Sequence, residues 1–144
     1  MDALEKFKIL IRKEFQFLCD DFEFKEEAFN TYSEYSISYA NSTTRVIVEG
    51  VNWGANVRVA LGSLSYKFED YDLGDLATID CQDAWDSFVK LDMPQNEQLP
   101  YLHSFLVTCG KDVLAGNFAI FPQLNETRKK ELMILMRMSR CQAY

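Results

Sequence analysis

Residues 35–68 consist of four short runs separated by turns: Tyr35-Ser-Ile-Ser-Tyr39, Arg45-Val-Ile-Val-Glu49, Asn56-Val-Arg-Val-Ala-Leu61 and Tyr66-Lys-Phe68. In the first and third runs large apolar residues alternate with small or polar ones, which is the period-two pattern of strands with one buried face. The turn segments 41–42 and 50–54 contain Asn and Gly, which tolerate positive φ. We therefore predict a four-stranded antiparallel meander.

The second run does not alternate, since Val46, Ile47 and Val48 are consecutive and all apolar. We predict that Val46 and Val48 face the core with the large residues of the neighbouring runs. Ile47 would then point outward beside Arg45 and Glu49, because successive strand residues point to opposite faces.

Helices are expected both before and after the sheet along the chain. Residues 2–19 carry an apolar stripe at helical spacing: Leu4, Phe7, Ile11, Phe15 and Leu18. A short helix is expected from Leu73 to Ile79. A longer one begins near 96–100, with Pro100 in its first turn, and ends at Gly116.

A last helix is predicted from residue 124, with Asn125 or Thr127 as its cap. Residues 101–144 hold six bases and three acids. We interpret the Leu and Met residues of this helix as core and its bases as partners of acidic neighbours; the alternative is a partner-binding helix. The whole chain is predicted to be one α+β domain, 1–144, with a helix at 2–19, the sheet at 35–68 and a helical region at 73–140.

The composition limits the kind of partner. The chain has 144 residues, of which 48% are hydrophobic, enough for one domain with a sizeable core. Its net charge of −7 argues against nucleic-acid binding, because phosphate contacts need clustered Lys and Arg. No signal-peptide pattern is evident at the N-terminus, and no apolar window approaches the roughly 18 to 20 residues that span a bilayer. We expect a cytoplasmic protein that binds neither membrane nor nucleic acid.

The acids are concentrated in two stretches. Residues 69–97 hold nine acids and one base, and residues 14–34 hold seven acids and one lysine among several aromatic residues. Such a mixture is typical either of a solvated link with inward-facing rings or of a recognition surface for a basic protein.

No catalytic, cofactor or metal site is predicted. The acids after residue 69 do not follow the spacing of a calcium-binding loop, and the four cysteines, Cys19, Cys81, Cys109 and Cys141, lack the short spacings of a zinc site. His103 is the single histidine, and we interpret it as a structural or surface residue. A deep pocket joining His103 to Cys81 or Cys109 would favour an enzyme instead.

Taken together, the order of these segments resembles that of small bacterial immunity proteins. The resemblance rests on the N-terminal helix, the aromatic and acidic link, the C-terminal helices, the segment 71–76 (Tyr-Asp-Leu-Gly-Asp-Leu) and the meander residues Tyr39, Val46, Val48, Val57 and Val59. Immunity proteins are cytoplasmic antidotes to toxins of contact-dependent inhibition and related polymorphic systems. The resemblance implies a non-catalytic protein that binds and neutralises a cognate toxin domain.

Acidic and aromatic side chains suit such a partner, since many toxin domains act on nucleic acids and carry a basic cleft. The hypothesis places the contact at Trp53, Asp70, Tyr71, Asp72 and Asp75. A second candidate surface comprises Asp20, Asp21 and Glu23. The alternative function is a non-catalytic adaptor or chaperone-like binding module that uses the same kind of face.

Overall fold

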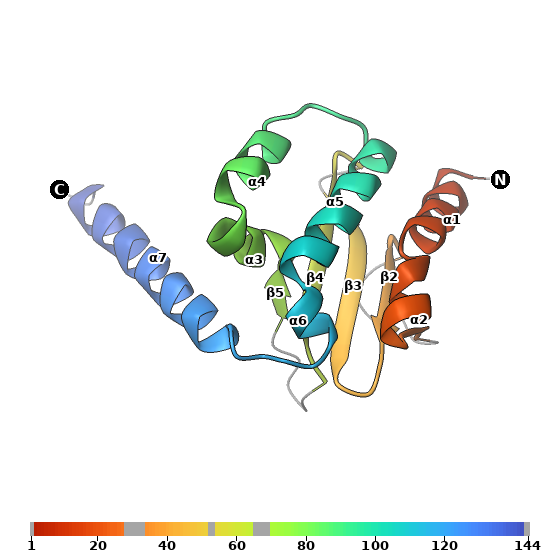
Figure 1. Cartoon of the computed structure of the whole chain (residues 1–144). Helices are drawn as coiled ribbons and strands as arrows, with labels where there is room; N and C mark the ends of the chain where they lie inside the picture. Colours follow the sequence, from red (N-terminus) through yellow and green to blue (C-terminus); the bar gives the residue numbers. More distant parts are fainter. Residues whose placement is uncertain (1, 28–33, 52–53, 65–69, 143–144) are drawn as a thin grey trace.

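The computed structural model describes residues 2–27, 34–51, 54–64 and 70–142 (Figure 1). In these residues one open antiparallel sheet has the strand order β1-β2-β3-β4-β5. The strands are β1 (Lys25–Glu26), β2 (Ser36–Ala40), β3 (Thr44–Val51), β4 (Asn56–Ser63) and β5 (Asp70–Asp72). The predicted α+β class and antiparallel meander are confirmed, with five strands rather than four.

The helices are α1 (Ala3–Glu14), α2 (Gln16–Phe22), α3 (Leu73–Asp80), α4 (Gln82–Val89), α5 (Gln95–Cys109), α6 (Lys111–Leu114) and α7 (Phe121–Gln142). Figure 1 shows α5 and α6 lying across one face of the sheet, with α1 and α2 beside β2 and with α3 and α4 beyond the opposite edge. The last helix, α7, runs away from the rest of the chain.

The extra strand and the last strand both differ from the predicted sheet. The two-residue strand β1 pairs with β2, a pairing too short to leave an alternating pattern in the sequence. The expected fourth strand, 66–68, lies outside the described residues. The edge strand that follows β4 and pairs with it is β5, which lies at the start of the segment that we expected to be an acidic surface.

One apolar row crosses four strands and forms the centre of the core. The register places Tyr39, Val46, Leu61 and Tyr71 side by side, and each is at most 2% exposed. The prediction for Ile47 is wrong in one respect. Ile47 does point to the opposite face, but it is only 2% exposed there, because its cross-strand neighbours on that face, Ser38 and Ala60, are buried with it.

Three of the predicted helix boundaries differ from those in the structure. The stripe 2–19 belongs to two helices, which meet at the fully buried Phe15. Pro100 lies beyond the first turn of α5, which begins at Gln95. The last helix begins at Phe121, so Asn125 and Thr127 are internal to α7 and do not cap it.

Two glycines end the helical segments of the α5 region. Gly110 closes α5, and a Cβ there would lie 2.9 Å from the Leu106 carbonyl oxygen, so this break needs glycine. Gly116 follows α6 with φ +90°, a conformation that L side chains rarely adopt. The chain leaves the sheet after this residue and enters α7.

Candidate interaction surface

The acids of α4 and its flanks lie at the surface without internal partners. We define the α4 surface as Asp80, Asp83, Asp86, Asp92 and Glu97 together with the apolar residues Val89, Leu91 and Tyr101. Among the described residues no side chain forms a hydrogen bond or ion pair with any of these five acids. The range 80–97 holds these five acids and one base, Lys90, a net charge of −4.

An aromatic cluster fixes α4 against α5. Trp85 meets Phe105 edge to face at 5.0 Å between ring centroids, and Phe88 stacks on Tyr101 at 5.5 Å. Because Trp85 and Phe88 face α5, helical periodicity turns Asp83 and Asp86 away from the core. The aromatic side chains of α4 thus pack against α5, and its acids lie on the opposite face of the helix.

Large apolar side chains at this surface are exposed. Val89 is 56% exposed, Leu91 51% and Tyr101 47%. They adjoin a groove of about 190 Å³ whose lining includes Trp85, Phe88 and Val89. An apolar centre bordered by charged groups is the composition of a protein-binding surface.

Two of the acids predicted to form the surface at 70–75, Asp72 and Asp75, are instead paired within the molecule. Arg58 holds the carboxylate of Asp72, and Arg128 of α7 holds that of Asp75 at 2.9 Å. The Asp75 carboxylate also accepts the backbone N–H of Asp72, which fixes the first turn of α3. These two acids join β4, β5, α3 and α7 to one another.

Tyr71, predicted to be an aromatic contact, is 1% exposed. Its hydroxyl donates to the side-chain oxygen of Asn125, its ring packs on Phe121, and the Arg128 guanidinium lies 4.3 Å from the ring centroid. The expected surface ring therefore belongs to the joint between β5 and α7. Trp53 lies outside the described residues, and the placement of the Asp70 side chain lies outside them as well.

The second predicted surface lies at the end of α2. Asp20, Asp21 and Glu23 are exposed, and the Asp20 carboxylate accepts a hydrogen bond from Gln16. Figure 1 shows α2 and α4 on opposite sides of α5, so the fold does not bring the two acidic stretches together.

The side chains named as possible catalysts are also separated. His103 Nδ1 lies 2.9 Å from the Glu14 carboxylate, and its ring stacks on Phe17 at 4.1 Å. Cys81 and Cys109 lie against each other instead, with their Sγ atoms 3.3 Å apart. In the described part of the chain no group of three His, Cys, Asp or Glu side chains is placed to hold a metal ion.

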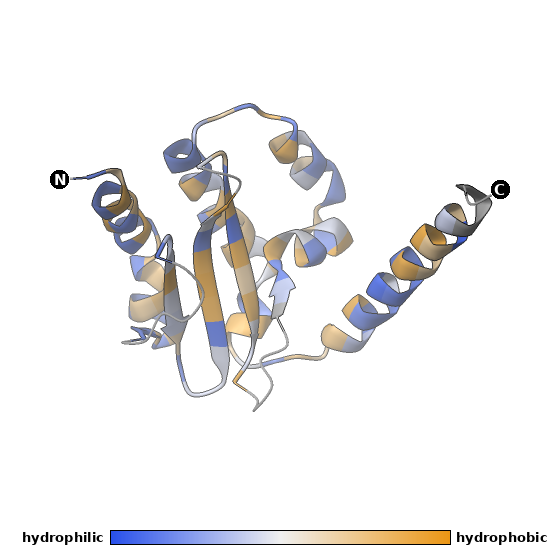
Figure 2. Cartoon of the chain, turned by 180° about the vertical axis from the view of Figure 1, so that it is seen from behind, coloured by the Kyte–Doolittle hydropathy of each residue, from blue (hydrophilic) through white to orange (hydrophobic). Residues whose placement is uncertain are grey.

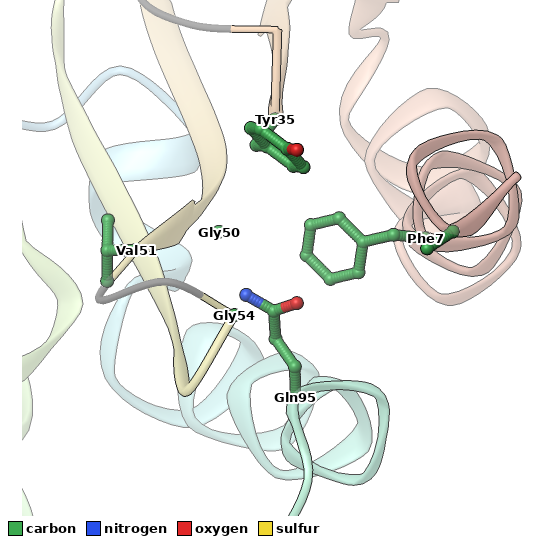
Figure 3. A pocket seen from close by; sticks show the side chains of 7 residues that line it. Phe7, Tyr35, Gly50, Val51, Gly54 and Gln95 are labelled. Carbon is green, nitrogen blue, oxygen red and sulfur yellow. The ribbon is translucent and has the colours of Figure 1, made fainter.

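A pocket of about 480 Å³ opens at the end of the sheet between α1 and the start of α5 (Figure 3). Phe7, Tyr35 and Gln95 point into it, and Gly50 forms its floor. The Gln95 amide donates to the Asn56 carbonyl, and a Cβ at Gly50 would lie 2.7 Å from that amide nitrogen. No carboxylate, histidine or cysteine is among its described lining residues, so the pocket suits an apolar group better than acid–base chemistry.

The sequence hypothesis placed the contact at residues 70–75, whereas the acids of this stretch that have no side-chain partner among the described residues lie at 80–97. The sequence signal for the α4 surface is the presence of the apolar Val89 and Leu91 among acids. The fold and this surface define an α+β protein with an open antiparallel meander and one acidic, partly apolar face. Comparisons with protein-family models, with curated proteins and with solved structures find no match. Within the described residues, none of the helices has the length and apolarity to cross a membrane.

Proposed function

We propose that this chain is a non-catalytic binding protein of the immunity type, which neutralises a basic toxin domain through the α4 surface. The observation that supports this most is the group of five acids, unpaired within the described part of the chain, together with the exposed Val89, Leu91 and Tyr101. The resemblance described from the sequence supplies the kind of partner. The proposal moves the contact from residues 70–75 to residues 80–101.

The arrangement suits tight inhibition of a basic domain. Unpaired carboxylates act over a distance of about a Debye length, roughly 8 Å at physiological salt, and speed the encounter with a positive cleft. The apolar residues at the centre slow dissociation once they are desolvated. Acids that are already paired with Arg58 and Arg128 contribute less, because their charge is neutralised within the molecule.

The decisive experiment joins binding to protection. The chain is co-expressed with the product of the adjacent gene, and we expect the two to co-purify and the cells to survive a toxin that otherwise kills them. The variant Asp83→Lys with Asp86→Lys should abolish protection and slow association by at least about tenfold at low salt, with a smaller effect at high salt.

The matched control is Asp20→Lys with Asp21→Lys, which reverses the same number of charges on the α2 side. We expect it to protect cells normally. Full protection by the α4 variant would overturn the proposal, and loss of protection in the α2 variant alone would move the contact to α2. Co-purification without protection would favour the adaptor or chaperone-like module.

A further inference from the structure

The second half of α7 carries a run of large apolar side chains that are about half exposed or more. Its exposed fractions are 59% for Leu132, 54% for Met133, 56% for Ile134, 61% for Leu135, 50% for Met136 and 55% for Met138. These residues were interpreted from the sequence as core, and the structure shows that interpretation to be wrong for the isolated chain. Figure 2 shows the apolar bands along the projecting helix, away from the rest of the molecule.

The apolar surface of this helix faces every direction. A helix turns once in 3.6 residues, so the five consecutive apolar residues 132–136 cover its whole circumference. A helix that is apolar all round is normally buried on all sides. Six such side chains make a surface of the order of several hundred Å², the size that marks an interaction site on a monomer.

The charge of α7 is opposite to that of the body. Residues 121–144 hold five of the 15 bases and two of the 22 acids, a net charge of +3, so residues 1–120 carry −10. Two such basic helices packed only on each other would repel, whereas a basic helix is attracted to the acidic body. Charge therefore favours contact between the α7 helix of one molecule and the body of another.

A groove of about 480 Å³ lies between α7 and the body. Its apolar lining includes Val57, Val59, Leu73 and Trp85. Its charged lining residues are Arg58, Asp72, Asp75 and Glu131, of which the last belongs to α7 itself. Asp72 is paired with Arg58 and Asp75 with Arg128, so the attraction for a basic arm comes from the net charge of −10 on residues 1–120. A second helix in this groove would contact the body on one side and the α7 helix of that same molecule on the other. Contacts on both sides would cover a helix that is apolar around its circumference.

The root of α7 is firmly attached, so the helix projects as an arm. Leu124 is 2% exposed, and Arg128 is held by Asp75 and by the Tyr71 ring. The apolar half beyond Arg128 extends from this anchor without a hinge between them. The arm can therefore enter a neighbouring molecule without leaving its own.

We propose that two copies of this chain form a symmetric dimer in which the α7 arm of each lies in the groove between the arm and the body of the other. Reciprocal exchange buries both apolar arms in one closed assembly. Each basic arm then lies against the negatively charged body of the partner copy.

The test measures oligomeric state with the whole chain. Size-exclusion chromatography with light scattering should give twice the monomer mass at micromolar concentration. The variant Leu132→Glu with Leu135→Glu should weaken the dimer at least about 100-fold, because it places two charges in a buried interface. These side chains are 59% and 61% exposed in the isolated chain, so the body should keep its circular dichroism spectrum. Gln123→Glu, at the exposed first turn of α7, is the control and should leave the mass unchanged.

A body variant tests the groove separately. Thr78 is exposed and lines the groove, and Thr108 is exposed on α5 outside it. Thr78→Lys should weaken the dimer by about tenfold or more, and Thr108→Lys should not. Added salt should weaken the dimer, because opposite charges attract across it.

Three results would overturn the proposal. The first is a monomer at all concentrations. This includes a monomer whose arm folds back on its own body, which would protect residues 132–138 from hydrogen exchange. A dimer that the arm variant leaves intact would exclude the arm. A dimer that salt strengthens would indicate arm-to-arm packing between like charges.

A second inference rests on the pair Cys81 and Cys109. Their Sγ atoms lie 3.3 Å apart, although the residues are 28 positions apart in the chain. Cys81 joins α3 to α4, and Cys109 ends α5, so the pair connects the base of α4 to the core helix. We propose that these two thiols form a reversible disulfide when the chain meets a small-molecule disulfide such as oxidised glutathione.

Oxidised glutathione can oxidise the two thiols by two steps of thiol–disulfide exchange. The thiolate of Cys81, the more exposed sulfur, attacks one sulfur of the oxidant and releases a thiolate. Cys109 then loses its proton, attacks the Cys81 sulfur and releases the second thiolate, so the protein loses two hydrogens while the oxidant gains two. Burial is the main cause that raises the pKa of Cys109 to about 12, with a further contribution from Cys81, which makes Cys109 the second and slower partner.

The test is peptide mapping after incubation with oxidised glutathione. We expect a linkage between the peptides of Cys81 and Cys109 and the loss of two free thiols, with a rise in Tm of several degrees because the cross-link closes a loop around α4. Cys109→Ser should leave a mixed disulfide on Cys81 and no rise in Tm. Glutathione retained on Cys81 of the unaltered chain, or linkage of either residue to Cys19 instead, would overturn this inference.

Discussion

The two ends of the acidic stretch 69–97 look alike in sequence and have opposite surroundings in the fold. At 70–75 the described carboxylates are held by Arg58 and Arg128, one earlier and one much later in the chain. At 80–97 the five acids have no such partner in the described structure. An acidic run therefore becomes a surface only where the fold brings no base back to it.

The two ends also differ in what they contribute to stability. Exposed ion pairs are worth about 0 to 1 kcal/mol, so the pairs at Asp72 and Asp75 mainly fix geometry. The larger contribution there comes from burial of the Tyr71 ring beneath Phe121. Residues 71–75 thus form a structural joint, while residues 80–101 are free to contact a partner.

The largest expected effect is that of removing a ring at each end. Tyr71→Ala should lower the free energy of unfolding by about 3–5 kcal/mol, because it leaves a cavity between β5 and α7. Tyr101→Ala, which removes a ring that is 47% exposed, should cost about 1 kcal/mol or less. Urea unfolding measures both, and equal losses would erase the distinction. Tyr71→Phe keeps the ring and should cost about 1 kcal/mol through the lost hydroxyl bond to Asn125.

A smaller contrast is expected for the carboxylates themselves. Asp75→Ala removes the acceptor for the Asp72 N–H and the partner of Arg128, and should cost about 1–2 kcal/mol. Asp92→Ala, in the exposed loop before α5, should change stability by no more than about 0.5 kcal/mol. The ranking reverses for partner binding, where Asp92 should matter more than Asp75. Thermal unfolding and association rates of the same two variants test both halves of this statement.

Local pattern was enough to predict the sheet but not which residues become surface. The alternation in 35–39 and 56–61 correctly gave the strands and the core face, because period two is a property of each strand alone. Ile47 was misjudged because its burial depends on what lies over the second face of the sheet. Tyr35 was expected inward and is 51% exposed, since it precedes the first residue of β2.

The pairing and burial of the predicted contact residues could not be foreseen for the same reason. Asp72, Asp75 and Tyr71 lie in an acidic run, and only tertiary structure shows that Arg128, 53 residues beyond Asp75, returns to them. The apolar residues of α7 were assigned to the core by their spacing, yet spacing along one helix does not show what covers it. Both features depend on long-range neighbours, which a reading of local sequence does not supply.

The second acidic stretch, 14–34, also contains both paired and unpaired acids. Substitutions of these acids give the smallest expected effect. Glu27 accepts hydrogen bonds from Arg45 and Ser38, whereas Asp21 is exposed and unpaired among the described residues. Burial opposes ionisation of Glu27, but the bonds from Arg45 and Ser38 outweigh it and lower its pKa below the usual 4.5. A lowered pKa adds stability that is present above pH 4.5 and is lost as the pH falls through the pKa of the folded state.

Glu27→Gln should therefore flatten the fall in unfolding free energy below pH 4.5, and Asp21→Asn should leave that fall unchanged. Chemical unfolding at several pH values between 3 and 7, at constant ionic strength, measures the slope for each variant. An identical slope for wild type and Glu27→Gln would mean that Arg45 and Ser38 do not favour the charged carboxylate over the neutral one. The division between paired and unpaired acids would then hold in the 69–97 stretch but not in the 14–34 stretch.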